Sequence, residues 1–282
     1  MRYKPFAATG VQLPVIGQGT WDVPEHGARL DEWQRALKRG IELGMTHIDT
    51  AEMYGSGSVE ELLGEAIRGI PRDSFFITGK VLPSNASFDG TIRACDRTLK
   101  RLRIDHLDAY LLHWPSGVPL EETMNALASL VRTGKTRFVG VSNFDVEDML
   151  EAKALLGSVP LACNQVLYHL HERGIEHRLV PAAREADVAV VAYTPFGRGR
   201  FPRAANVGDV LERIATKHAA TARQVILAFL TRESNVFTIP KASHVKHVEE
   251  NAGAGDLILD DTDVASIDAA FPVGRERPLA TL

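Results

Sequence analysis

The stretch LDAYLLHWPSGVPLEETMNALASLVRTGKTRFVGVS, residues 107–142, contains one complete strand–helix–strand unit. Its two ends, Leu107–His113 and Phe138–Ser142, are short and almost continuously apolar, which is typical of strands buried on both faces of a parallel sheet. Between them, Glu121–Arg132 carries apolar residues at helical spacing, and Gly134 follows it as a stop signal. The stretch therefore predicts a βαβ unit.

The same unit recurs along the chain, with strands starting about every 30 residues. Eight apolar runs predict strands: Val15–Gly19, Thr46–Thr50, Phe75–Lys80, Leu107–His113, Phe138–Ser142, Leu161–Gln165, Val188–Tyr193 and Val236–Pro240. Eight segments predict helices: Arg29–Leu43, Ser58–Ile67, Thr91–Leu102, Glu121–Arg132, Val146–Leu156, Glu176–Glu185, Val207–His218 and Ala222–Arg232. This alternation predicts an α/β fold, a (β/α)8 TIM barrel.

The first residues predict a β-hairpin. Lys4–Phe6 and Val11–Leu13 flank Thr9-Gly10, and in a barrel this hairpin would close the bottom. The segment Gly55-Ser56-Gly57 has Glu60 where a dinucleotide fingerprint needs its last glycine, which disfavours the doubly wound nucleotide fold. Because no linker or low-complexity stretch interrupts the chain, we expect residues 1–282 to form a single domain.

The composition is that of an ordinary globular protein, with 45% hydrophobic and 24% charged residues. The net charge is −4 without a block of like charge, which argues against nucleic acid or an anionic membrane as a partner. Cys95 and Cys163 do not support a disulfide framework, and the polar N-terminus lacks a signal core, so we expect a cytoplasmic protein. His169 and His171 lack further ligands, so we expect no metal.

Polar side chains end three consecutive predicted strands. Asp49, Lys80 and His113 stand at these ends and Tyr54 follows closely, which places them at the face where barrels carry their active sites. Alone, each residue is more often a loop cap, a solvated strand end, a core histidine or a rim aromatic. Together they suit proton donation: an ammonium group favours the phenolate, a carboxylate holds the ammonium charged, and an imidazole orients a carbonyl.

Six motifs occur in a fixed order between about Leu13 and Phe271. They are GMTHIDTAEMY (Gly44–Tyr54), LLHWP (Leu111–Pro115), GVSNF (Gly140–Phe144), NQ (Asn164-Gln165), YTP (Tyr193–Pro195) and IPKAS (Ile239–Ser243). With these motifs the sequence resembles the aldo-keto reductase family, and most of all its small bacterial members that reduce methylglyoxal and related aldehydes. The resemblance implies an oxidoreductase that reduces aldehydes or ketones to alcohols by hydride transfer from NADPH. We expect a small-molecule carbonyl substrate and a monomer.

The resemblance also implies a role for each matching residue. Tyr54 would be the general acid, Lys80 and Asp49 the pair that tunes it, and His113 the residue that positions the carbonyl. The cofactor would contact Thr20, Trp21, Asp49, Ser142, Asn143, Gln165, Tyr193, Thr194, Pro195, Phe196, Lys241, Ala242, Ser243, His247, Glu250 and Asn251. The substrate pocket would be formed by Trp21, Tyr54, His113 and Trp114, with Pro272–Leu282 as a flap.

One position departs from the family pattern. His247 stands six residues after Lys241, where the family commonly has an arginine that contacts the 2′-phosphate of NADP. Arginine offers a permanent, bidentate charge that a neutral histidine does not. Since Lys241 and Ser243 are present, we expect a preference for NADP(H), with NAD(H) as the alternative cofactor.

Two other functions fit parts of the pattern. Some barrels that resemble this family bind the cofactor as regulatory subunits without turnover. Alternatively, a strand-end lysine such as Lys80 could form a Schiff base, as in an aldolase, with Asp49 as proton shuttle. The second alternative leaves Tyr193 and Lys241 without a role, and the complete set around Tyr54 favours catalysis over the first.

Overall fold

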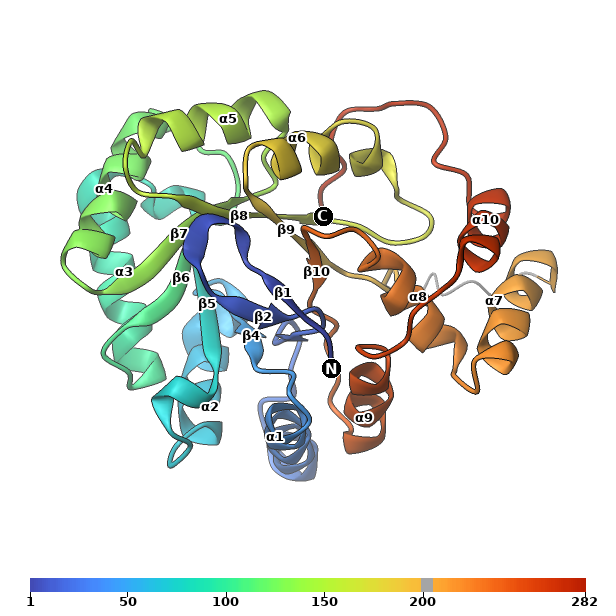
Figure 1. Ribbon diagram of the computed structural model, residues 1–282. Coiled ribbons are helices and arrows are strands. Elements are labelled where there is room, and N and C mark those ends of the chain that lie inside the picture. The colour runs from blue at the N-terminus through green and yellow to red at the C-terminus, as the bar shows by residue number, and fades with distance from the viewer. Residues whose placement is uncertain (199–204) are drawn as a thin grey trace.

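The computed structural model describes residues 1–198 and 205–282, and it forms an α/β barrel (Figure 1). Its central sheet has eight described strands, which neighbour one another in chain order and pair in parallel wherever their registers are given. These strands are β3 (Gln18–Gly19), β4 (His47–Asp49), β5 (Phe76–Val81), β6 (Leu107–Leu112), β7 (Thr136–Ser142), β8 (Leu161–Leu167), β9 (Ala189–Tyr193) and β10 (Val236–Thr238). The predicted (β/α)8 barrel is confirmed.

The first and last strands meet at an irregular seam. Gly17 donates its backbone N–H to Thr238 O at 2.7 Å, and Ile16 forms an isolated parallel bridge to Thr238. A Cβ on Gly19 would lie 2.7 Å from the carbonyl oxygen of Ile239, so this close approach requires glycine. The predicted strands at both sides of the seam are therefore longer than the regular ladders found there.

The helices lie outside the sheet (Figure 1). They are α1 (Gly27–Glu42), α2 (Ser58–Ala66), α3 (Phe88–Leu102), α4 (Leu120–Arg132), α5 (Val146–Leu155), α6 (Leu179–Glu185), α7 (Ala205–Lys217), α8 (Ala222–Leu230), α9 (Val245–Gly253) and α10 (Asp261–Ala270). Helix α6 starts later than predicted because a 3₁₀ turn, Gly174–Glu176, precedes it. The bounds of α9 and α10 were not predicted; α10 buries only Asp263 and Ile267, so its apolar stripe is weak. No helix of the described residues is long and apolar enough to cross a bilayer.

The N-terminal hairpin closes the bottom of the barrel, as predicted. Strands β1 (Tyr3–Pro5) and β2 (Gln12–Pro14) pair antiparallel and cross in front of the sheet in Figure 1. The buried ring of Phe6 packs edge-on against the rings of His47, Phe76 and Phe237 at 5.4–6.0 Å. Phe6 therefore closes the barrel at this end and leaves the opposite end to carry the site.

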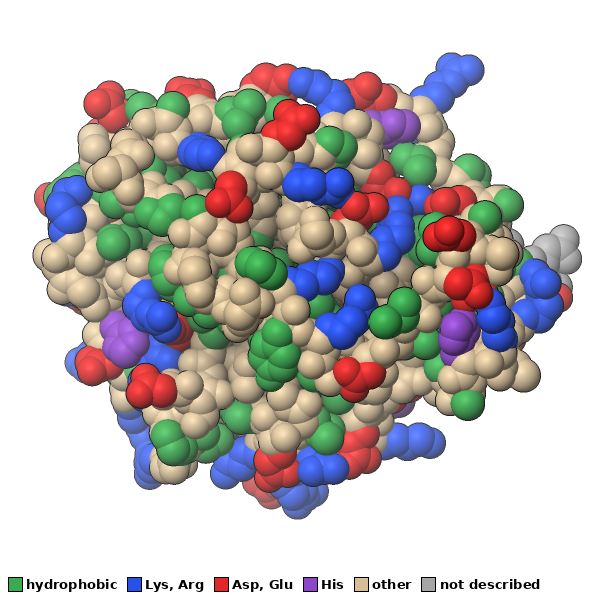
Figure 2. Space-filling model, in the orientation of Figure 1, with side chains coloured by type: hydrophobic (Ala, Val, Ile, Leu, Met, Phe, Trp, Pro, Cys, Tyr) green, Lys and Arg blue, Asp and Glu red, His purple; other side chains and the backbone are tan. Residues whose placement is uncertain are grey.

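Figure 2 shows the face of the molecule seen in Figure 1. On this face, acidic and basic side chains are interspersed over the described surface.

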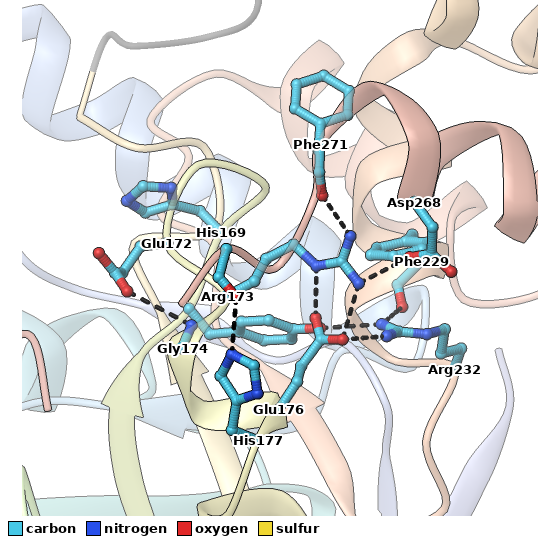
Figure 3. Close-up of polar contacts among 12 residues, drawn as sticks. His169, Glu172, Arg173, Gly174, Glu176, His177, Phe229, Arg232, Asp268 and Phe271 are labelled. Atoms are coloured by element: carbon cyan, nitrogen blue, oxygen red, sulfur yellow. Dashed lines mark hydrogen bonds and ion pairs between the residues drawn. The ribbon is translucent and has the colours of Figure 1, made fainter. Parts of the chain in front are cut away.

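An ion network around the buried Arg173 fixes the end of α10 (Figure 3). Arg173 is 3% exposed and donates to Glu176 and to Asp268, each at 2.7 Å, and to the carbonyl oxygen of Phe271 at 2.5 Å. Arg232 adds a second cation, 2.7 Å from Glu176. Asp268 lies in the last turn of α10 and Phe271 directly follows the helix. The network therefore holds the start of the segment that runs back across the barrel to the C-terminus (Figure 1).

We expect Arg173→Ala to lower the free energy of unfolding by about 3 kcal/mol, measured by urea denaturation. The substitution removes the buried cation that Glu176, Asp268 and a backbone carbonyl share, while Arg232 still pairs with Glu176. Arg178→Ala is the matched control, because its ion pair with Glu147 is exposed and should contribute less than about 1 kcal/mol. Equal urea midpoints for the two variants would contradict this role of Arg173.

Candidate active site

A cavity of about 600 Å³ opens at the carboxyl ends of the barrel strands. Asp49 ends β4, Ser142 ends β7 and Tyr193 ends β9, and all three line it. The volume lies in the range of small-molecule and cofactor sites. This is the face at which a barrel of this type carries its chemistry.

The centre of the site is a buried lysine. Lys80 Nζ donates to Asp49 Oδ1 at 2.5 Å, to the carbonyl oxygen of Thr50 at 3.1 Å and to Tyr54 Oη at 3.3 Å. In the β4–β5 ladder Asp49 pairs with Thr78, so Lys80, two residues further along β5, projects from the same face of the sheet. Lys80 is fully buried, Asp49 is 1% exposed and Tyr54 8%, so these contacts are shielded from bulk water. The predicted meeting of these three side chains is present.

Burial and neighbouring charges together determine the protonation states of Tyr54 and Lys80. Burial raises the pKa of Tyr54 above 10.0, although Lys80 opposes that rise through its charge and its hydrogen bond. Burial alone would lower the pKa of Lys80, but Asp49 and then Tyr54 raise it above 10.5. The sequence predicted that Lys80 would make the phenol more acidic, but burial outweighs the effect of Lys80. At neutral pH the phenol therefore keeps its proton and the amine its charge.

His113 forms a neutral wall of the cavity. Burial, and next the charge of Lys80, lower the pKa of His113 to about 2, so the imidazole carries no charge at neutral pH. Its ring stacks on Trp114 at 3.9 Å and lies 6.0 Å from the ring of Tyr54. The ring of Trp21 packs edge-on against the ring of Tyr54, with 5.2 Å between the two ring centroids. The four residues predicted for the substrate pocket all line this cavity.

Hydrogen bonds connect this centre to side chains on β8 and β9 and to Asn143, which directly follows β7. Gln165 Nε2 donates to Asp49 Oδ2 at 2.7 Å. Asn143 Nδ2 donates to the carbonyl oxygen of His113 at 3.0 Å, and Tyr193 Oη donates to Asn143 Oδ1 at 2.8 Å. Asn143 has φ +63°, a left-handed conformation that asparagine tolerates better than most residues. The amides are therefore held in place before any ligand enters.

The side of the cavity beyond β10 suits a phosphate. Lys241 is half-buried and lines the cavity; burial lowers its pKa, and the nearby carboxylate of Asp22 partly offsets this. The Oγ of Ser243 is buried without a hydrogen-bond partner among the described residues. Helix α9 begins two residues later, at Val245. An unsatisfied hydroxyl beside a lysine and a helix N-terminus fits an anionic group.

The cavity brings together most of the residues predicted to bind the cofactor. Those that line it are Thr20, Trp21, Asp49, Ser142, Asn143, Gln165, Tyr193, Thr194, Pro195, Phe196 and Lys241. The predicted residues Ala242, Ser243, His247, Glu250 and Asn251 do not line it; they lie in the turn after Lys241 and on α9.

Sequence reasoning missed several lining residues, among them Arg198 and Arg223. Arg223 lies in the first turn of α8, and in a βα-barrel the first turn of a helix lies near the strand ends where the site is. Its place in the first turn of a predicted helix was therefore the sequence signal that could have identified Arg223 as a cavity residue. Arg198 follows the YTP motif by three residues, and no spacing rule pointed to it.

The comparisons with known proteins agree with this geometry. The Aldo/keto reductase family model matches residues 15–271. Methylglyoxal reductase YeaE of Escherichia coli (strain K12) is 43% identical over 277 residues, which are 98% of this chain and 97% of that protein. Glyoxal reductase of Bacillus subtilis (strain 168) is 34% identical over 262 residues, 92% and 90% of the two chains. A crystal structure of an aldo-keto reductase from Klebsiella pneumoniae in complex with NADPH has a TM-score of 0.92 and 39% identity and covers all of both chains. The resemblance found in the sequence is confirmed: the chain belongs to the aldo/keto reductase family.

Proposed function

We propose that this protein reduces small aldehydes and ketones to alcohols with NADPH, and that Tyr54 is the general acid. The observation that carries the proposal is the buried contact of the Tyr54 hydroxyl with Lys80, which Asp49 holds in place at the cavity. Family membership supports carbonyl reduction, and the relatives from E. coli and B. subtilis act on methylglyoxal and glyoxal by name.

The chemistry follows from the protonation of these groups. Bound NADPH supplies the hydride. Tyr54 donates its proton to the carbonyl oxygen as negative charge develops there, and Lys80 stabilises the phenolate that remains. Asp49 keeps Lys80 charged, and the neutral imidazole of His113 donates a hydrogen bond that orients the carbonyl oxygen.

NADP(H) is the cofactor that the site fits best. The Klebsiella relative was solved with NADPH. The unsatisfied Ser243 hydroxyl and the half-buried Lys241 of this chain offer a phosphate two partners. Tyr193, held by Asn143, presents a planar ring on which the nicotinamide would stack, and Gln165 and Asn143 present amides for its carboxamide.

We expect the purified protein to oxidise NADPH when methylglyoxal is added, with kcat/KM for NADPH at least about tenfold above that for NADH, a difference of about 1.4 kcal/mol. The aromatic walls formed by Trp21 and Trp114 favour small and medium aldehydes. Initial rates with both cofactors over a panel of aldehydes test this. A lower KM for NADH would overturn the cofactor assignment, and NADPH binding without turnover of any carbonyl would favour the regulatory alternative.

The Schiff-base alternative fits the site poorly. Lys80 donates to three oxygen atoms, is fully buried, and has a raised pKa, so its amine is not a free nucleophile. Borohydride treatment in the presence of an aldehyde should leave Lys80 unmodified, as judged by peptide mass spectrometry.

We also propose a cytoplasmic location and a monomeric state. The free, buried thiols of Cys95 and Cys163 are compatible with a reducing compartment. Sedimentation velocity of the purified protein tests the monomer directly, since a second species of twice the mass would contradict it.

A further inference from the structure

We propose that Arg223 binds the ribose 2′-phosphate, the group that distinguishes NADP(H) from NAD(H), and so sets the cofactor preference. This inference rests on the proposed use of a nicotinamide dinucleotide. Arg223 lines the same cavity as Lys241, and it is not part of a family motif quoted above.

The position of Arg223 is fixed by contacts between α8 and α9. On one side of it, Thr221 Oγ1 donates to Glu250 Oε1 at 2.7 Å, and on the other, Gln224 Nε2 donates to the carbonyl oxygen of Glu250 at 2.9 Å. The start of α8 therefore lies against α9, the helix that follows Lys241 and Ser243. This places Arg223 at the phosphate side of the cavity.

An aromatic ring holds the guanidinium at this place. The Arg223 guanidinium carbon lies 4.8 Å from the ring centroid of Phe196, a cation–π contact. Phe196 packs against the same buried apolar cluster as Ala242 and Val245, which lie just before and at the start of α9. Through this shared cluster, the ring that contacts Arg223 lies on the side of the barrel that contains the unsatisfied Ser243 hydroxyl.

Two other basic side chains, Arg198 and His247, do not fill this role. Arg198 lies 5.5 Å from the ring of Trp21, which itself packs on Tyr54, so Arg198 belongs to the catalytic end. His247 is exposed, does not line the cavity and has its Nδ1 3.4 Å from Glu250. Arg223 therefore supplies the guanidinium that the sequence lacks at position 247.

The negative charge of a 2′-phosphate needs more positive charge than Lys241 alone provides. A phosphate monoester carries about −1.5 to −2 charges at neutral pH. Lys241 carries a single positive charge, which also interacts with the Asp22 carboxylate, so it neutralises only part of such a group. An arginine stays charged at any physiological pH and can donate two hydrogen bonds to one phosphate.

The test uses 2′,5′-ADP and 5′-AMP, which differ only in the 2′-phosphate and need no turnover. By isothermal titration calorimetry we expect Arg223→Gln to weaken 2′,5′-ADP binding about tenfold or more, equal to about 1.4 kcal/mol. Binding of 5′-AMP should change less than about twofold, and Arg223→Lys should give an intermediate loss. Arg213→Ala removes the same charge from an exposed position on α7 and should change neither affinity.

Each result has a distinct meaning. An equal loss for both nucleotides would show that Arg223 holds the adenine or the 5′-phosphate, and no loss would show that it holds neither; both overturn the inference. If the wild-type protein binds neither nucleotide nor NADPH, the proposed function falls as well. If 2′,5′-ADP binding depends on Arg223 but no carbonyl is reduced, the inference stands and the proposed catalysis does not.

Discussion

Replacing Tyr54 by Phe is expected to lower kcat for NADPH-dependent reduction of methylglyoxal about 10³-fold, within the range typical of a lost general acid. The substitution removes only the hydroxyl oxygen that lies 3.3 Å from Lys80 Nζ. The ring would still pack on Trp21 and beside His113, so the dissociation constant for NADPH should change less than about twofold. Steady-state rates and fluorescence titration with NADPH measure the two effects separately.

Tyr110→Phe is the matched control for this experiment. Tyr110 lies on β6, is fully buried and does not line the cavity, so its hydroxyl can be deleted without touching the site. Its kcat should stay within about twofold of the wild-type value. Because the pKa of Tyr54 is raised, the donor proton is present throughout the neutral range, and kcat for reduction should not fall as pH rises across it. Turnover by Tyr54→Phe at the wild-type rate would remove Tyr54 from the mechanism.

Most of the catalytic centre could be predicted because it depends on chain order. Asp49, Lys80 and His113 lie at or within one residue of the ends of neighbouring strands, and neighbouring parallel strands bring their carboxyl ends to one edge. The YTP motif marks Tyr193 at the end of β9 in the same way. A regular alternation of apolar strands and amphipathic helices thus fixes both the fold and the rim on which these residues stand.

The rest depends on distances and burial that the sequence does not contain. The net pKa shift of Tyr54 is the balance of burial against one cation, and only the packed site shows that burial prevails. Arg223 reaches the cavity because α8 lies against α9. Helix α10 has a clear start signal, the capping box of Asp260 and Asp263, but too few buried apolar side chains to reveal its length.

Lys80→Met is expected to abolish measurable turnover and also to destabilise the protein by about 3–5 kcal/mol, because it leaves the Asp49 carboxylate buried without its cation. The loss of activity alone would thus be ambiguous. Adding Asp49→Asn to the Lys80→Met variant removes the unpaired negative charge. The asparagine still offers a side-chain oxygen to Gln165 Nε2, which in the wild-type protein donates to Asp49 Oδ2 at 2.7 Å. The double variant should therefore recover most of the urea midpoint.

Turnover and the urea midpoint, measured for the single and the double variant, distinguish a purely structural lysine from one that acts on Tyr54. If Lys80 only fills space and balances charge, the double variant should regain turnover together with stability. If its ammonium stabilises the phenolate formed when Tyr54 gives up its proton, stability returns while kcat stays at least about 10²-fold below the wild-type value. The second outcome is the expected one, because nothing else among the described residues brings a positive charge to hydrogen-bonding distance of the Tyr54 hydroxyl.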